Sequence, residues 1–177
     1  MARKFGKKNK VKLDPFSYNS IFLGESGIGK TTLVYNMLKK YVGEDGYLFL
    51  ECGKEDGEEA IEGINAVKVL QWDEVDEDTV DFYASEDVDV GGFEEIIDSI
   101  IDNKNELYPD LKVVVIDTYD ELLKIAEPYV IELHNREHTD KRTTSIKAAF
   151  GGFMGGEDKC DEICLNKLWE LKKVGVH

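Results

Sequence analysis

The sequence is poor in the residues that mark disulfide-rich and membrane-spanning proteins. Its 177 residues include three cysteines and three prolines, and no run of eighteen apolar residues occurs. The start of the chain also lacks a signal-peptide pattern, so we expect a protein of the cytoplasm that makes no membrane contact. Because 42% of the residues are hydrophobic, the chain is long enough for one domain with a substantial core.

Metal-ligand patterns are equally scarce. Cys52, Cys160 and Cys164 form no C-x-x-C pair, and the spacing of the last two is more typical of packing on one helix face than of metal binding. His134 and His138 are four residues apart but lack a third ligand, so we interpret them as polar surface residues. We therefore expect reduced thiols and no site built from cysteine or histidine.

Positive charge is scarce outside the first residues of the chain. The sequence has 22 basic and 37 acidic residues and a formal net charge of −15, yet its first thirteen residues hold six bases and no acid. We expect a basic flexible leader over residues 1–16 and a folded domain over residues 17–177. The acidic body repels nucleic acid, so only the leader or a local basic patch could attract a phosphate backbone.

The most informative motif is a glycine-rich loop. Residues 24–31 read GESGIGKT and fit the pattern G-x-x-x-x-G-K-[ST] at every fixed position. A short apolar segment, residues 20–23, precedes the loop as a predicted strand, and residues 31–40 follow with helical spacing. Strand, loop and helix form the context that a phosphate-binding loop needs. A dinucleotide-binding loop is excluded, because Thr32 stands where its third glycine would be.

The residue types in this loop suit a nucleoside triphosphate. Glycines let successive backbone N–H groups approach the phosphates closely. We predict that Lys30 acts as a catalytic residue with its ammonium on the β- and γ-phosphates, and that the Thr31 hydroxyl ligates Mg²⁺. The predicted nucleotide contacts are Gly24, Glu25, Ser26, Gly27, Ile28, Gly29, Lys30, Thr31 and Thr32.

A second element of the phosphate site is predicted at Asp117. Residues 111–117 read LKVVVID, a β-branched run that ends in an acid. An aspartate at the C-terminal end of a buried strand beside the loop can hold the hydration shell of the Mg²⁺ that Thr31 ligates. Asp117 is therefore the predicted partner of Thr31 at the metal.

The remaining pattern predicts an α/β fold. Residues 47–50 and 66–70 are short apolar runs typical of buried parallel strands, and residues 93–101 have the periodicity of an amphipathic helix. Further helices are predicted over residues 58–64, 120–128 and 157–173. Residues 150–156 read FGGFMGG, which we interpret either as a mobile surface loop or as a contact for a substrate or a neighbouring subunit.

The predicted nucleotide is ATP. A GTPase needs an N-K-x-D guanine reader, and residues 166–169 read NKLW without the aspartate. A small-molecule kinase usually carries an arginine-rich lid, whereas only Arg136 and Arg142 follow Lys30. A phosphoryl-transfer kinase therefore remains only as a third alternative.

Four segments together resemble the phage-encoded nucleotide-binding proteins of the RecA-like AAA group, which are linked to phage recombination and single-strand annealing. The segments read IFLGESGIGKTTLVYNMLKKY, YLFLECGKEDG, LKVVVIDTYDELLKIA and AAFGGFMGGEDKCDEICLNKLWELKKVGVH. The resemblance runs from about residue 17 to the end of the sequence. The order and spacing of the four segments point to the phage group, whereas the two phosphate-site motifs alone identify only the P-loop NTPase superfamily.

The resemblance implies a RecA-like three-layer sandwich with a mostly parallel central sheet. It also implies ATP and Mg²⁺ as cofactors, action on single-stranded DNA in the host cytoplasm, and a homo-oligomer with hydrolysis at subunit interfaces. A water-activating glutamate is implied just past the strand that follows the loop helix. Glu51 and Glu55 are both candidates for this catalytic role, and Glu55 is slightly favoured.

The resemblance further implies that the fold continues beyond the sequence. RecA-like sheets place another strand, which carries a polar sensor, between the loop strand and the metal strand. The sequence ends about where that strand should begin, and residues 174–177 read VGVH as a short stub of it. We therefore expect a truncated domain without its C-terminal strands. A nucleotide-binding module with little hydrolysis remains the alternative to an active ATPase.

Overall fold

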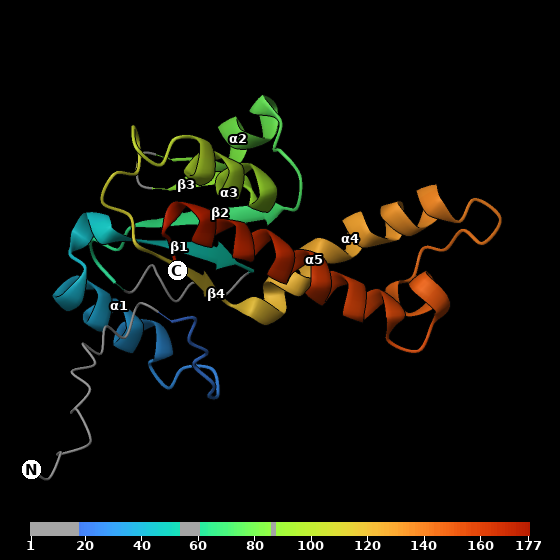
Figure 1. Ribbon diagram of the computed structural model, residues 1–177, viewed down its shortest axis with the longest axis horizontal. Helices are drawn as coiled ribbons and strands as arrows, with labels where there is room; N and C mark the ends of the chain where they lie inside the picture. The colour runs from blue at the N-terminus through green and yellow to red at the C-terminus, as the bar shows by residue number, and fades with distance from the viewer. Residues whose placement is uncertain (1–17, 54–60, 86–87) are drawn as a thin grey trace, which may run out of the picture.

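The computed structural model describes residues 18–53, 61–85 and 88–177. The predicted basic leader and Glu55 lie outside these ranges. Among the described residues, four parallel strands form one sheet in the order β3-β2-β1-β4, with helices on both faces (Figure 1). The predicted α/β fold with a parallel sheet is confirmed.

Three of the strands coincide with predicted apolar runs, namely β1 (Tyr47–Cys52), β2 (Ala66–Gln71) and β4 (Val113–Asp117). The fourth, β3 (Asp89–Gly92), was not predicted, because half of its four residues are glycine. Gly92 is required by space, since a Cβ there would lie 1.7 Å from the carbonyl oxygen of Asp73. The described part of the predicted 58–64 helix, residues 61–64, forms a bend and a turn followed by a residue without regular structure.

The side chains of the strands alternate between two hydrophobic layers. On one face, Tyr47, Phe49 and Val113 pack against α1 (Lys30–Tyr41). On the other face, the larger cluster joins the sheet to α3 (Phe93–Asp102), α4 (Tyr119–Glu137) and α5 (Gly155–Leu171). The short helix α2 (Glu77–Tyr83) has no buried residue and contacts β3 at the edge of the sheet. No helix in the described ranges is long and apolar enough to span a bilayer.

Helix α4 runs through Pro128, where the sequence predicted its end. A proline inside a helix removes one hydrogen bond and costs about 3 kcal/mol or more. Four buried residues of α4 are each four positions apart, namely Leu122, Ala126, Val130 and His134. Burying Leu122 and Val130 alone contributes roughly 1.5–3 kcal/mol each, which offsets the cost. His134 is therefore a core residue, and its interpretation as a surface residue was wrong.

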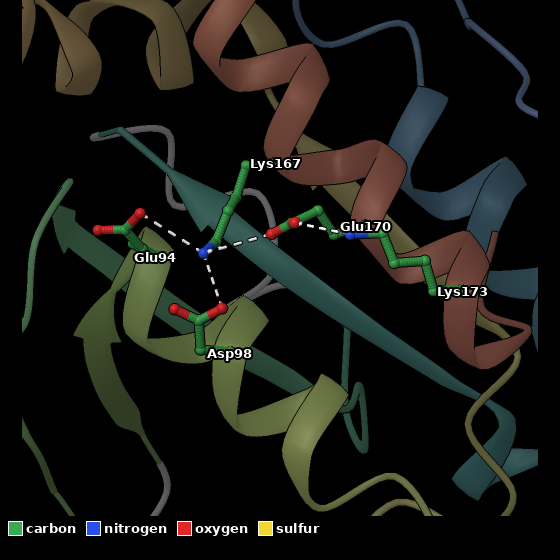
Figure 2. A network of polar contacts seen from close by, with 5 residues as sticks. All are labelled: Glu94, Asp98, Lys167, Glu170 and Lys173. Carbon is green, nitrogen blue, oxygen red and sulfur yellow. Dashed lines mark hydrogen bonds and ion pairs between the residues drawn. The ribbon is translucent and has the colours of Figure 1, made fainter.

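Helices α4 and α5 form a hairpin that extends past the end of the sheet (Figure 1). Lys167 of α5 fastens the hairpin to α3, because its ammonium lies 2.7 Å from Asp98 and 3.4 Å from Glu94 (Figure 2). The side chain of Lys167 is only 11% exposed. Burial lowers its pKa, but the hydrogen bond to Asp98 and the charges of Glu94 and Glu170 outweigh this effect and leave the pKa raised.

The predicted strand over residues 20–23 is not formed. These residues have no regular secondary structure, and the exposed fractions of Ile21 and Leu23 are 86% and 90%. A strand needs a neighbour to satisfy its backbone groups, and no described strand lies beside this segment. The outer edge of β4 is instead paired with His177, whose N–H donates to the Lys112 carbonyl and whose carbonyl accepts from the Val114 N–H, both at 2.9 Å.

Candidate nucleotide-binding site

The glycine-rich loop leads directly into α1. Gly27 and Gly29 adopt positive φ angles of 76° and 87°, a conformation that side chains rarely tolerate. Gly29 is the residue before the first turn of α1, and that turn contains no acid, whereas the last turn holds Lys39 and Lys40. No acidic side chain of the helix itself therefore offsets the partial positive charge of its N-terminus. This is the arrangement that binds phosphate at a helix start.

The ammonium of Lys30 lies over the loop. It donates hydrogen bonds to the carbonyl oxygens of Gly24 and Glu25, each at 3.0 Å. Gly24 cannot be replaced without a shift, because a Cβ there would lie 2.4 Å from Cδ1 of Ile28. The two hydrogen bonds hold the cation inside the curve of the loop. The other predicted contacts, Glu25, Ser26, Ile28 and Thr32, are exposed along the same segment.

The two predicted metal residues lie together. The Thr31 hydroxyl donates to Oδ2 of Asp117 at 2.6 Å, although 86 positions separate the two residues in the sequence. Thr31 is in the first turn of α1, and Asp117 is the last residue of β4. A hydroxyl and a carboxylate side by side supply only oxygen ligands, which is the donor set that Mg²⁺ prefers.

No group of three or more His, Cys, Asp or Glu side chains suitable for a metal occurs within the described ranges. Mg²⁺ is usually held by one or two protein oxygens together with waters and substrate phosphates. Cys52, Cys160 and Cys164 are all buried and form no disulfide. Burial raises the pKa of Cys160 to about 11 and that of Cys164 to about 12, so both thiols stay neutral in the folded protein.

Glu51 lies beside Asp117 in the sheet. The two residues are direct partners in the parallel pairing of β1 with β4, and neighbouring strands are about 4.8 Å apart. Because strand side chains alternate, Glu51 points to the same face as Phe49, and Asp117 points to the same face as Val115. Phe49 and Val115 both belong to the cluster under α1. Glu51 therefore faces the layer that holds the loop, whereas Glu55 is not in the described ranges.

Lys68 is a neighbour of the site that the sequence did not reveal. It pairs with Glu51 across β1 and β2, and it is half-buried. Ala66, two residues earlier, packs in the cluster under α1, so alternation directs Lys68 to the same face. Across the three strands the order is Asp117, Glu51 and Lys68. Glu51 therefore lies between an acidic and a basic residue. The alternation of Ala66 and Lys68 with Val67 and Val69 was the signal that could have identified it.

The start of α4 ties the metal strand to the hairpin. The Tyr119 hydroxyl, two residues after Asp117, donates to Oδ1 of Asp161 on α5 at 2.6 Å. Burial and the nearby Asp161 carboxylate raise the pKa of Tyr119 far above its usual range, so its hydroxyl keeps the proton that it donates. The hydrogen bond thus connects the start of α4, next to Asp117, to α5.

Comparison with known proteins gives one family match. The family described as AAA domain matches residues 18–154, which is more than three quarters of the chain. Neither the curated proteins nor the solved structures contained a match. The match covers the glycine-rich loop, Lys30, Thr31, Glu51 and Asp117, the residues that the structure brings to one face of the sheet. The chain belongs to the AAA-domain family of P-loop NTPases.

Proposed function

We propose that this protein binds ATP with Mg²⁺ at residues 24–32 and hydrolyses it to ADP and phosphate. The observation that supports the proposal is the 2.6 Å hydrogen bond between Thr31 and Asp117, two oxygen-bearing side chains that meet at the start of the helix that follows the glycine-rich loop. Sequence motifs alone cannot create that proximity, because the two residues come from different elements. The absence of a guanine reader in the sequence favours ATP over GTP.

Each residue has a separate role in this proposal. Lys30 places its ammonium on the terminal phosphates, and the N–H groups of the loop donate to the phosphate oxygens. Thr31 and Asp117 hold the metal, with Asp117 acting directly or through water. Bound Mg²⁺ supplies charge neutralisation at the phosphate oxygens.

Glu51 is the proposed base that activates the attacking water. It faces the loop layer and is the strand neighbour of Asp117, so it lies on the correct side of the sheet for this role. Lys68, the strand neighbour of Glu51 on the other side, is the proposed positioning residue for that carboxylate. Glu55, which the sequence slightly favoured, lies outside the described residues and stays a candidate for the same role.

A module that binds nucleotide with little turnover is the second candidate function. Two observations favour it. Residues 20–23, directly before the loop, are exposed and do not pair with any described strand. Regular structure therefore adjoins the loop only at α1. Arg136 is in the last turn of α4 and Arg142 follows that helix, so neither of these two arginines comes from an element that carries the loop or Asp117.

The cellular setting is proposed from the resemblance of four sequence segments to phage proteins. We infer a phage ATPase of DNA recombination that handles single-stranded DNA in the host cytoplasm and hydrolyses ATP at homo-oligomer interfaces. The folded domain would span residues 17–177, after a basic leader of residues 1–16. Membrane contact is not part of this proposal.

Nucleotide binding is tested with a fluorescent ATP analogue and Mg²⁺ on the full chain. Lys30→Ala should weaken binding by about 100-fold, because the ammonium makes charge-assisted contacts that water replaces poorly. Lys40→Ala removes an equal charge from the last turn of the same helix and should bind like the wild type. Equal affinity of the two variants would contradict the assignment of the loop.

Turnover is tested by phosphate release at rising protein concentration, with and without single-stranded DNA. Glu51→Gln should bind ATP normally and lose about 100-fold to 10,000-fold in release, the usual effect of removing a general base. Glu106→Gln makes the same change at an exposed residue outside the site and should be unaffected. Binding without release in the wild type at every concentration would leave only the module.

A further inference from the structure

We propose that the tip of the α4–α5 hairpin, residues 138–154, is the surface that binds single-stranded DNA. The inference rests on the proposed function, and it names where the DNA binds. The tip contains η3 (Ile146–Gly151) and connects the two helices at the end farthest from the sheet (Figure 1). Its charge, its exposed aromatic ring and its backbone support the proposal independently.

The tip is basic in a protein that is otherwise acidic. Within residues 138–154 the bases are Lys141, Arg142 and Lys147 and the only acid is Asp140, which gives a net charge of +2. Since the whole chain carries −15, the remaining 160 residues carry −17. All three basic side chains are exposed. The first turn of α5 carries Glu157 and Asp158, so the basic surface is limited to the tip itself.

The tip presents large apolar side chains to solvent. Phe153 is 98% exposed and Met154 is 57% exposed, and they are adjacent in the sequence. Phe153 is the most exposed of the large hydrophobic side chains in the described residues. An exposed aromatic ring beside Lys and Arg is the combination that binds single strands, because bases stack on the ring while the cations contact phosphates.

Side chains at the end of α4 hold the segment that carries Phe153 in place. The Phe150 N–H donates to Nδ1 of His134 at 3.1 Å, and the Phe150 ring lies 5.1 Å from that imidazole. Asn135 exchanges two hydrogen bonds with the backbone of Thr143, at 2.7 and 2.8 Å. The buried His134 also bonds the Lys141 carbonyl through Nε2 at 3.0 Å. The tip is thus a built platform on α4, and the exposure of Phe153 does not result from a loose loop.

The backbone of the tip is strained at the residues that carry these side chains. Phe150, Phe153 and Met154 have φ angles of 48°, 39° and 69°, and they are the only non-glycine residues with positive φ in the described ranges. Such conformations cost on the order of 1–3 kcal/mol each and concentrate at functional sites. The strain turns Phe150 inward onto the histidines while Phe153 stays in solvent.

The tip is distant from the nucleotide site but firmly connected to it. Helix α4 has 19 residues and begins two residues after Asp117, so the tip lies roughly 28 Å from the metal residues at 1.5 Å per residue. The Tyr119–Asp161 hydrogen bond and the Lys167 ion pairs hold the two helices against each other and against α3. DNA on the tip therefore does not compete for space with ATP in the loop.

The test measures fluorescence anisotropy of a labelled oligo-dT with the full chain at several salt concentrations. Phe153→Ala should weaken binding by about fivefold to 100-fold, the range for one base stacked on an aromatic ring. Lys141→Glu with Arg142→Glu should weaken it further and reduce the salt dependence, because fewer counterions are displaced. The matched controls are Phe82→Ala, an exposed ring on α2, and Lys112→Glu at the opposite end of the sheet.

The outcomes separate this proposal from the proposed function. Tip variants that lose oligo-dT binding and keep ATP binding support it. Lys30→Ala should lose ATP binding and keep the oligo-dT affinity that is measured without nucleotide. Tip variants that bind oligo-dT like their controls would overturn the proposal, and so would a wild type that does not bind oligo-dT. If the tip variants change only the sedimentation of the protein, the tip is an interface between copies, which also overturns it.

Discussion

Two apolar segments were predicted as strands of the phosphate site, and only one of them is a strand. Residues 113–117 form β4, which pairs along its length with β1 and ends at Asp117. Residues 20–23 have a similar composition but lie in solvent, with Ile21 and Leu23 almost fully exposed. The difference shows that apolar composition does not make a strand unless a neighbouring strand can satisfy its backbone groups. One side of the site is fixed by the sheet, and the other is fixed only by Lys30 and α1.

The largest effect that separates the two segments is on stability. Phe49→Ala removes a fully buried ring from the strand that pairs with β4, and it should lower the free energy of unfolding by about 3–5 kcal/mol. Ile21→Ala should change it by about 0.5 kcal/mol or less, because the side chain is already in water. Urea denaturation of both variants measures the difference. Equal destabilisation would mean that residues 20–23 are buried in solution.

A second effect tests whether β4 positions the metal ligand. Asp117→Ala should weaken ATP binding in the presence of Mg²⁺ by about tenfold to 100-fold and should change it little in EDTA. Asp110→Ala removes an exposed acid just before β4 and should leave both affinities unchanged. Isothermal titration with and without metal gives the comparison. An equal loss in EDTA would show that Asp117 supports the fold and does not hold the metal.

A third effect tests how the sheet face opposite the loop is held. Lys167→Met leaves Glu94 and Asp98 without their shared cation and should lower the free energy of unfolding by about 1–3 kcal/mol (Figure 2). Lys173→Met removes a cation that is 70% exposed and should cost about 0.5 kcal/mol or less. Thermal unfolding followed by circular dichroism distinguishes them. A loss of the same size in both variants would contradict a special role for Lys167.

A fourth effect is a pH dependence in the same layer. Cys160 and Cys164 ionise near pH 11 and 12 when folded, whereas an unfolded cysteine ionises near pH 8.5. The unfolded chain therefore binds fewer protons above pH 8.5, so stability is complete below that pH and falls as the pH rises toward 11. Urea midpoints from pH 8 to 10.5 should decrease. Replacing both cysteines with alanine should flatten the decrease, and an unchanged slope would assign it to other groups.

Much of the fold could be predicted, because its strands and helices carry strong local patterns. β1, β2 and β4 are continuous apolar runs, and α3 repeats its apolar residues at helical spacing. The exceptions arise where tertiary contacts override local preference. Packing carries α4 through Pro128, and β3 needs Gly92 because the backbone of Asp73 passes close to it. Neither contact is visible in the local sequence.

The candidate site was predictable in part for the same reason. The loop and Asp117 have recognisable motifs, and the structure brings Thr31 and Asp117 into contact. The positions of Glu51 and Lys68 depend on register across three strands, which the sequence of a single strand does not contain. The basic tip is likewise a property of three dimensions, because η3 and two helices must meet before Phe153 is presented.

The hydrogen bond from Thr31 to Asp117 has a consequence for how quickly a metal can be accepted. The two oxygen atoms are already 2.6 Å apart, so neither side chain has to change its rotamer. In the proposed site, the hydroxyl proton would rotate away so that Thr31 offers a lone pair to the metal, and Asp117 would bind it directly or through water. The Thr31 hydroxyl can rotate in this way without a conformational rearrangement of the chain. The ordering entropy of the site is thereby spent during folding, and little of it remains to oppose metal binding.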